Sequence, residues 1–148
     1  MKVVCTNRKA SFFYHLISKY EAGLQLKGSE VKAIREGNVN IKESFVRIKN
    51  FEMFIIGMHI GEYSHKGYSS HDPLRDRKLL MHKNEIYKIY KDSENKGKTI
   101  IPIKLYFKNG KLKIEIALAK GKKNWDKRES KKQKDIKREI DRSMKGKN

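Results

Sequence analysis

Apolar and polar residues alternate along two stretches in the second half of the chain, 99–107 and 111–120. From Leu112 to Leu118 every second residue is apolar, which is the period-two pattern of a strand with one buried face. The dipeptide Asn109-Gly110 separates the two stretches, and it is the strongest short hairpin signal in the chain. The pattern therefore predicts an antiparallel hairpin.

The first half of the chain shows the same alternation in Ser44–Lys49 and Glu52–Tyr63, with Asn50 near the turn. These stretches predict a second hairpin. Upstream, aromatic and β-branched residues are frequent from Phe12 onward and predict a strand that continues to Leu26. Gly23 lies inside this run, which suggests a bulge or a bend.

Two short helices are predicted between the strands. Residues 28–37 have Ser29 as a candidate N-cap and Gly37 as a terminator. A second helix is expected from His82 or Lys83 to Lys91, because apolar residues before and within it follow helical spacing: Leu79, Leu80, Ile86, Ile89 and Tyr90. Between the second hairpin strand and this helix, residues 64–77 are rich in Gly, Ser, Asp and Pro and predict a loop.

This order gives five or six strands with two helices inserted, and it lacks the strand-helix rhythm of a parallel sheet. The predicted fold class is mainly β with short helices, in the form of a small closed or partly open antiparallel barrel over residues 1–120. Residues 121–148 form a separate basic tail. Ile136, Ile140 and Met144 make a narrow apolar stripe there, which predicts a tail that is disordered when free and helical when bound.

Charge changes the picture most, because 36 Lys and Arg face 17 Asp and Glu, a formal net charge of +19. Both the body and the tail are basic, so a polyanion is the expected partner for each. No apolar run is long enough to span a bilayer, so no membrane partner is expected. A single cysteine and the absence of a secretory signal fit a reducing cytoplasm.

Candidate catalytic and metal-binding chemistry is weak. His59, His65 and His71 have no partner cysteines at ligand spacing, and Ser70, His71 and Asp72 are consecutive where a triad needs separated segments. We expect no enzyme, no metal and no cofactor. Five aromatic residues are candidates for stacking on RNA bases, although most aromatics of a small barrel belong to its core: Tyr14, Tyr20, Phe45, Tyr63 and Tyr68.

Two acidic residues, Glu21 and Glu30, lie in basic surroundings. Each has two interpretations: a surface ion pair with a nearby lysine, or a carboxylate that accepts hydrogen bonds from an exposed base edge. Among the basic residues, Lys111 and Lys113 share a strand face. We expect the loop cations to meet them on one side of the barrel, where all would contact phosphates: Arg75, Arg77 and Lys78.

Six short motifs, in order along nearly the whole chain, resemble those of the SsrA-binding protein family, also called the small protein B family. They are Asn7-Arg8-Lys9-Ala10, Tyr20-Glu21-Ala22-Gly23, Gly28-Ser29-Glu30-Val31-Lys32, Arg77-Lys78-Leu79-Leu80, Ala119-Lys120-Gly121-Lys122-Lys123 and Asp126-Lys127-Arg128. The resemblance implies an oligonucleotide-binding (OB-like) barrel without catalytic activity. It also implies a partner, transfer-messenger RNA, whose tRNA-like part the barrel grips.

The resemblance further implies delivery by the elongation factor that carries aminoacyl-tRNA, to the empty A site of a stalled ribosome. There the tail enters the vacant mRNA channel as a helix. RNA-binding roles fall on residues of the body and of the junction with the tail: Asn7, Glu21, Leu80, Lys113, Lys120 and Lys122. Ribosome-binding roles fall on residues of the tail: Trp125, Asp126, Lys127, Arg128 and Met144.

The chain departs from the family pattern at Trp125, where His or Tyr is usual, and at Ser143, where Ile is frequent. Two other functions are alternatives to the adaptor. A structural ribosomal protein with a basic arm would stay on washed ribosomes, and a nuclease or RNA-modifying enzyme would change a labelled tRNA-like RNA.

Overall fold

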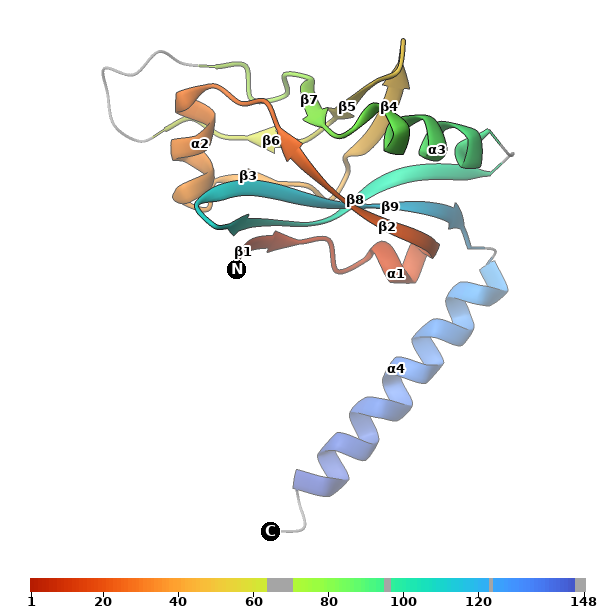
Figure 1. The fold of residues 1–148 in the computed structure, drawn as a ribbon. Helices are drawn as coiled ribbons and strands as arrows, with labels where there is room; N and C mark the ends of the chain where they lie inside the picture. Colours follow the sequence, from red (N-terminus) through yellow and green to blue (C-terminus); the bar gives the residue numbers. More distant parts are fainter. Residues whose placement is uncertain (64–70, 95–96, 123, 146–148) are drawn as a thin grey trace.

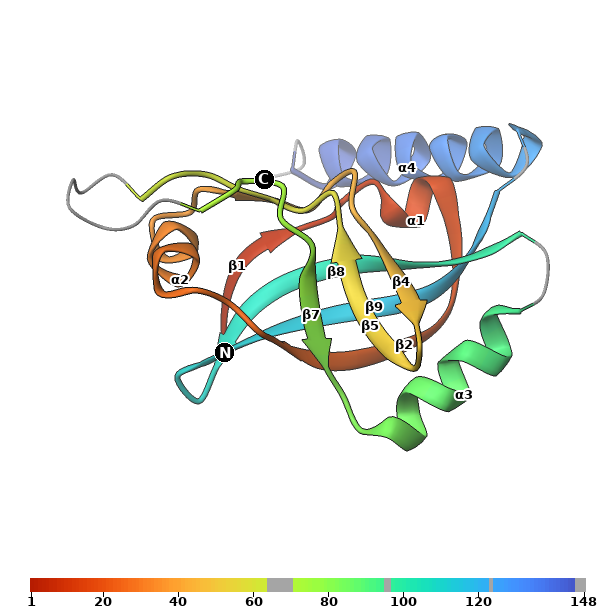
Figure 2. The same ribbon diagram turned by 90° about the horizontal axis from the view of Figure 1, so that it is seen from above.

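Antiparallel strands close into a ring in the computed structural model, which describes residues 1–63, 71–94, 97–122 and 124–145 (Figures 1 and 2). A seven-stranded sheet has the order β1-β8-β4-β5-β7-β2-β9, and β8 also pairs with β9. All its strands except β1 therefore belong to the ring, which confirms the predicted mainly β, OB-like class. The strands are β1 (Lys2–Thr6), β2 (Tyr14–Leu24), β4 (Phe45–Lys49), β5 (Glu52–Ile56), β7 (Arg77–Leu80), β8 (Lys98–Lys108) and β9 (Lys111–Gly121).

Both predicted hairpins are confirmed, and each has a two-residue turn with positive φ at both positions. The angles are 52° and 59° at Asn50-Phe51, between β4 and β5, and 52° and 74° at Asn109-Gly110, between β8 and β9. Turns of this hand match the right-handed twist of the flanking strands. They also fix the register, which pairs Lys49 with Glu52 and Lys108 with Lys111.

The expectation of one unbroken strand from Glu52 to Tyr63 is wrong. Gly57 ends β5 with a φ of +80°, and a Cβ there would lie 3.1 Å from the carbonyl oxygen of Glu43. The chain then forms β6 (His59–Ile60), which pairs with β3 (Val39–Asn40) in a separate two-stranded sheet. A glycine with positive φ thus sends the chain out of the ring.

The strand predicted from Phe12 begins later than expected. Phe12 belongs to the short helix α1 (Ala10–Phe13), since the amides of Phe12 and Phe13 both donate to the carbonyl oxygen of Lys9 at 3.1 Å. The bulge of β2 lies between Leu16 and Ser18, not at Gly23. Gly23 instead marks the place where β2 has β9 on one side and β7 on the other.

The helices α2 (Gly28–Arg35) and α3 (Lys83–Ser93) confirm the two predicted helices. The N-cap of α2 is Lys27, so the prediction of Ser29 as the cap is wrong. Leu79 and Leu80 are not part of a helical pattern either. They alternate in β7, where Leu79 is buried and Leu80 exposed, as the period of a strand requires.

One hydrophobic core fills the ring and extends under α2 and α3. Its largest fully buried apolar side chains come from α2, β5, β6, β7, α3, β8 and β9 and from the connections between elements: Ile34, Ile41, Met53, Ile55, Met58, Ile60, Leu79, Ile89, Leu105, Ile114 and Ile116. Ile86 and Ile89 are the buried residues of α3, so the opposite side of this helix faces solvent. This leaves side chains on the ring and on α3 available for contact with a partner.

The tail forms the helix α4 (Asn124–Lys145), which leaves the body after β9 and passes beside α1 (Figures 1 and 2). Ile136 and Ile140 are exposed on it, and no described side chain of α4 belongs to the hydrophobic core. The tail is helical in this structure. Disorder of the free tail and helix formation on binding both stay predictions. Within the described residues, no helix has the length and apolar character of a membrane span.

Candidate nucleic-acid interface

The outer face of β2, β9 and β8 carries charged side chains whose positions follow from the strand register. Lys113 of β9 lies opposite Gly23 of β2 and Tyr106 of β8. Since side chains alternate along a strand, Lys111 and Lys113 project to one face while Ile114 projects into the core. The prediction that these two lysines share a face is therefore confirmed.

An open depression of about 440 Å³ lies where β2, β7, β9 and the start of α3 meet. Its lining brings together three residues that the sequence assigned to RNA binding, Glu21, Leu80 and Lys113. The other lining residues are Gly23, Met81, His82 and Glu85. A Cβ at Gly23 would lie 3.4 Å from the Cβ of Leu80, which is close to an ordinary van der Waals contact, so the backbone of β2 runs directly beside Leu80.

Glu21 is held in place from one side and open on the other. The hydroxyl of Tyr106 donates to its Oε2 at 2.5 Å, and the Nζ of Lys108 lies 3.5 Å from the same oxygen. The hydrogen bond from Tyr106, with smaller contributions from Lys108 and Lys113, lowers the pKa of Glu21. The side chain is 40% exposed, so an ionised carboxylate with unused acceptor positions faces solvent.

The partner of Glu21, Tyr106, is itself buried beneath the charged face. Burial first, and then the hydrogen bond to the carboxylate, raises the pKa of the Tyr106 hydroxyl, which therefore remains a donor at neutral pH. The ion pair with Lys108 agrees with the first interpretation of Glu21. Recognition of a base edge, the second interpretation, stays a prediction.

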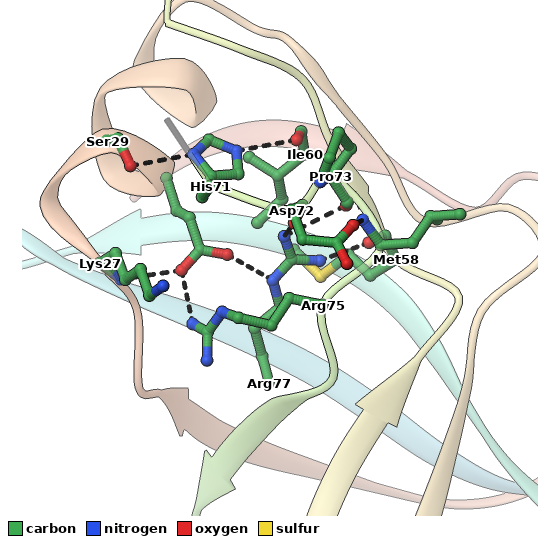
Figure 3. A network of polar contacts seen from close by, with 11 residues as sticks. Lys27, Ser29, Met58, Ile60, His71, Asp72, Pro73, Arg75 and Arg77 are labelled. Carbon is green, nitrogen blue, oxygen red and sulfur yellow. Dashed lines mark hydrogen bonds and ion pairs between the residues drawn. The ribbon is translucent and has the colours of Figure 1, made fainter. Parts of the chain in front are cut away.

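Glu30 fits neither of its two interpretations, because its carboxylate is fully buried and bound by two arginines (Figure 3). Its Oε2 accepts from the Nε of Arg77 at 2.5 Å, and its Oε1 accepts from Arg75 at 2.5 Å and from the backbone amide of Lys27 at 2.8 Å. Burial alone would raise the pKa of Glu30, but these hydrogen bonds lower it by more. Glu30 is thus a structural residue that fixes α2 to the segment before β7.

The position of Arg77 contradicts the expectation that this residue contacts phosphate, because its guanidinium is buried. Besides Glu30, it donates to the backbone carbonyl oxygens of Met58 at 2.5 Å, Asp72 at 3.2 Å and Pro73 at 3.1 Å (Figure 3). Lys78 lies 3.5 Å from Glu52 on the surface. The prediction that Arg77 joins Lys111 and Lys113 in a phosphate-binding surface is therefore wrong.

His71 is buried and belongs to the same network, so it has a structural role. Its Nε2 donates to the carbonyl oxygen of Ile60 at 2.9 Å, and its Nδ1 lies 2.9 Å from the hydroxyl of Ser29 (Figure 3). His59 is exposed in β6, and His65 lies outside the described residues. In the part of the chain that the structure describes, no His, Cys, Asp and Glu side chains group together as metal ligands would.

The other predicted residues lie away from the depression. Asn7 is buried, and its Nδ2 donates to the carbonyl oxygen of Pro102 at 3.1 Å. Lys120 is exposed at the far end of β9, roughly 23 Å along the strand from Lys113. The backbone amide of Lys122 donates to the carbonyl oxygen of Phe13 at 2.9 Å, beside α1. Their roles in RNA binding stay predictions.

The predicted ribosome-binding residues all lie on the backbone of α4: Trp125, Asp126, Lys127, Arg128 and Met144. Of these, only Arg128 has a described side chain, and it is exposed. Among the candidate stacking residues, Tyr14, Tyr20, Phe45 and Tyr63 are half-buried, whereas Tyr68 lies outside the described residues.

Sequence reasoning missed Tyr106, although a signal for it was present. A two-residue turn at Asn109-Gly110 fixes the pairing of β8 with β9, and this register places Tyr106 opposite Lys113. His82 and Glu85 had no such signal. They reach the depression only because two residues separate the end of β7 from α3, which packs against β8 and β9.

Known proteins of one family are similar to this chain over nearly its whole length. The sequence model of one protein family, described as SmpB protein, matches residues 4–146. The SsrA-binding protein of Persephonella marina is 56% identical over 147 residues, which are 99% of this chain and 97% of that protein. The SsrA-binding protein of Aquifex aeolicus is 52% identical over 145 residues, which are 97% of this chain and 92% of that protein.

A solved chain from a structure described as "tmRNA-SmpB: a journey to the center of the bacterial ribosome" is similar in fold to this chain. It is 40% identical in sequence and superposes with a TM-score of 0.69. The match covers 84% of this chain and 87% of that chain.

Proposed function

Because this chain belongs to the SmpB protein family, we propose that it is an RNA-binding adaptor for transfer-messenger RNA in the rescue of stalled ribosomes. Its body binds the tRNA-like domain of that RNA and brings it to the ribosomal A site. The observation that carries the proposal is the depression in which Glu21, Leu80 and Lys113 meet. These residues come from β2, β7 and β9, and the fold alone brings them together.

Three residues of the depression have separate tasks in this proposal. Lys113, with Lys108 and Lys111 on the same side of the sheet, contacts phosphates and supplies affinity that depends on salt. Glu21 accepts a hydrogen bond from a base edge or a ribose hydroxyl, which a purely cationic surface cannot do. Leu80 is 50% exposed and packs against the apolar face of a sugar or base.

The tail has the second task, contact with the small ribosomal subunit at the decoding site and in the vacant mRNA channel. Residues 121–148 carry twelve basic and five acidic side chains, which suits an RNA-lined channel. The cost of ordering a tail with so few apolar residues makes its binding conditional on a fitting surface. Trp125 to Arg128 begin this contact and Met144 lies near its end.

The protein acts without catalysis, and it works in the cytoplasm together with the elongation factor that carries aminoacyl-tRNA. In this proposal the factor delivers the aminoacylated RNA while the adaptor supplies the contacts of the missing codon-anticodon pair. A structural ribosomal protein would remain on ribosomes washed free of stalled complexes. The proposed adaptor is recruited with its RNA and dissociates.

A truncation separates the two tasks. Removing the chain from Asn124 onward deletes α4, which contributes no described residue to the hydrophobic core. We expect affinity for a tRNA-like RNA, measured by fluorescence anisotropy, to stay within about threefold, because the depression is intact. Peptide tagging on a stalled ribosome should be abolished. A truncated protein that loses most of its RNA affinity, or that keeps full tagging activity, contradicts the division of labour.

A further inference from the structure

Three exposed aromatic side chains meet beside the β4–β5 turn, away from the depression around Glu21. Phe51 lies in the turn, and Tyr87 and Tyr90 lie one helical turn apart on α3, which passes next to that turn (Figure 2). The ring centroids of Phe51 are 6.2 Å from Tyr87 and 5.8 Å from Tyr90. Despite these contacts the three residues remain 54%, 48% and 39% exposed.

The backbone at Phe51 is unusual for an aromatic residue. Its φ of 59° lies in the left-handed region, at a position of a two-residue turn where glycine is strongly preferred. For a non-glycine residue this backbone conformation costs roughly 1–2 kcal/mol of conformational free energy. The chain therefore presents an aromatic ring at a position where a glycine would give a more stable turn.

Cations accompany the aromatic rings. The Nζ of Lys91 lies 4.9 Å from the centroid of Tyr87. Tyr90 also lines a surface depression of about 230 Å³ between α3 and the sheet, together with Phe45, Arg47 and Lys98. No acidic residue is among the lining residues that the structure describes. Exposed aromatic side chains interleaved with lysine and arginine are typical of surfaces that bind unpaired RNA strands.

We propose that Phe51, Tyr87 and Tyr90 form an aromatic platform on which unpaired RNA bases stack, with Arg47, Lys91 and Lys98 contacting the adjoining phosphates. This inference extends the proposed function, because it gives the adaptor a further RNA contact outside the depression. The two sites adjoin the same helix, since His82 and Glu85 at the start of α3 face the depression while Tyr87 and Tyr90 face the turn. One RNA that docks in the depression can therefore lay an unpaired segment across the platform.

The test uses the full chain and a short, labelled single strand of oligoadenylate as the probe. Phe51→Gly removes one ring and relieves the backbone, so the variant should fold at least as stably as the parent protein. Tyr87→Leu removes a second ring but keeps an apolar helical residue, and Tyr87→Phe is the matched control that keeps the stacking face. None of these substitutions changes the net charge, so electrostatic binding by the basic tail is the same in all variants.

We expect Phe51→Gly and Tyr87→Leu each to weaken oligoadenylate binding by about fivefold or more, as for the loss of one stacked base, while Tyr87→Phe binds like the parent. The ring resonances of Tyr87 and Tyr90 should also shift on addition of the oligonucleotide. Unchanged affinity in both ring-removing variants would overturn the proposal. It would leave the cluster as an anchor between the hairpin and α3, or as a contact for another protein.

The outcome is separate from that for the depression. Glu21→Lys and Lys113→Ala should weaken binding of the tRNA-like RNA. In a protein that carries either of these substitutions, Phe51→Gly should still weaken binding of oligoadenylate. If the depression variants bind the tRNA-like RNA normally, the proposed function fails while the platform is judged on oligoadenylate alone. If only the platform variants bind normally, the further inference fails and the proposed function stands.

Discussion

Glu30 and Glu21 occupy similar basic surroundings in the sequence, but they belong to two very different regions of the molecule. The carboxylate of Glu30 is fully buried and takes its hydrogen bonds from Arg75, Arg77 and a backbone amide. The carboxylate of Glu21 lies on the rim of an open depression, held by Tyr106 and Lys108 but 40% exposed. In both regions the partners lower the pKa of the carboxyl, so both are ionised at neutral pH.

The two carboxylates differ in how many of their hydrogen-bond acceptor positions are already occupied by protein donors. Every oxygen of Glu30 has a partner inside the protein, so its ionisation stabilises the fold and offers nothing to a ligand. Glu21 is oriented by one donor and keeps acceptor capacity directed at solvent. Charge and pKa therefore do not distinguish a charged residue of a binding surface from a structural one. What distinguishes it is an exposed acceptor position that has no partner inside the protein.

The largest expected effect comes from Glu30→Ala. Removing one partner of a buried ion pair leaves Arg77 charged and uncompensated in the interior, which should lower the free energy of unfolding by roughly 3–5 kcal/mol. Urea denaturation followed by circular dichroism measures the change. Glu52→Ala is the matched control, because its pair with Lys78 is exposed and should contribute no more than about 1 kcal/mol. Equal effects of the two substitutions would contradict the contrast between buried and surface pairs.

Glu21→Lys should weaken recognition and cause a smaller loss of stability than Glu30→Ala, because the buried hydroxyl of Tyr106 loses its acceptor. The substitution adds positive charge, but it removes an ionised acceptor whose hydrogen bond is worth roughly 1.5–3 kcal/mol, about tenfold or more in affinity. We expect weaker binding of the tRNA-like RNA and slightly stronger binding of an unrelated duplex RNA, both measured by filter binding. A uniform gain for all RNAs would show that Glu21 has no part in recognition.

Lys113→Ala should have a smaller effect that concerns salt dependence. Loss of one phosphate contact reduces the slope of log affinity against log salt concentration by about one. Titrations of the tRNA-like RNA at several salt concentrations measure this slope. Lys88→Ala, which removes an exposed lysine on α3, is the control and should leave the slope closer to that of the parent. The role of Lys113 would be wrong if its removal did not change the slope.

The smallest expected effect is a shift in the pH dependence of binding after Tyr106→Phe. Glu21 is ionised above its lowered pKa, so RNA binding should be retained at neutral pH and weaken as the pH falls through that value. Tyr106 is the largest cause of the lowering, so without its hydroxyl the loss should begin at a higher pH. Circular dichroism at each pH checks that the fold persists. An unshifted profile would mean that Tyr106 does not set the ionisation of Glu21.

Much of the fold followed from local pattern. Asn109-Gly110 predicted a hairpin and fixed its register, and the alternation from Leu112 to Leu118 identified the buried face of β9. The errors arose where one local feature redirected the chain. Gly57 ended a strand whose apolar pattern continued, and Leu79 and Leu80 lay too close to α3 for a strand to be separated from a helix by spacing alone.

The candidate site was predictable residue by residue but not as an assembly. The resemblance assigned Glu21, Leu80 and Lys113 to RNA binding, and the ring of strands then brought them into one depression. Arg77 was misassigned because nothing in a single sequence distinguishes a cation at the surface from one that is buried against a carboxylate. Its partner Glu30 lies 47 residues away along the chain.

The sequence by itself determined the basic character of both parts of the chain, the two hairpins and the presence of a tail with too few apolar residues to form a core of its own. These features depend on composition and on neighbours a few residues apart. Only the tertiary structure decided which charges are buried, which aromatic rings stay exposed on α3, and which strands meet at Gly23. Such features depend on contacts between segments distant in the sequence, and these contacts exist only once the ring has closed.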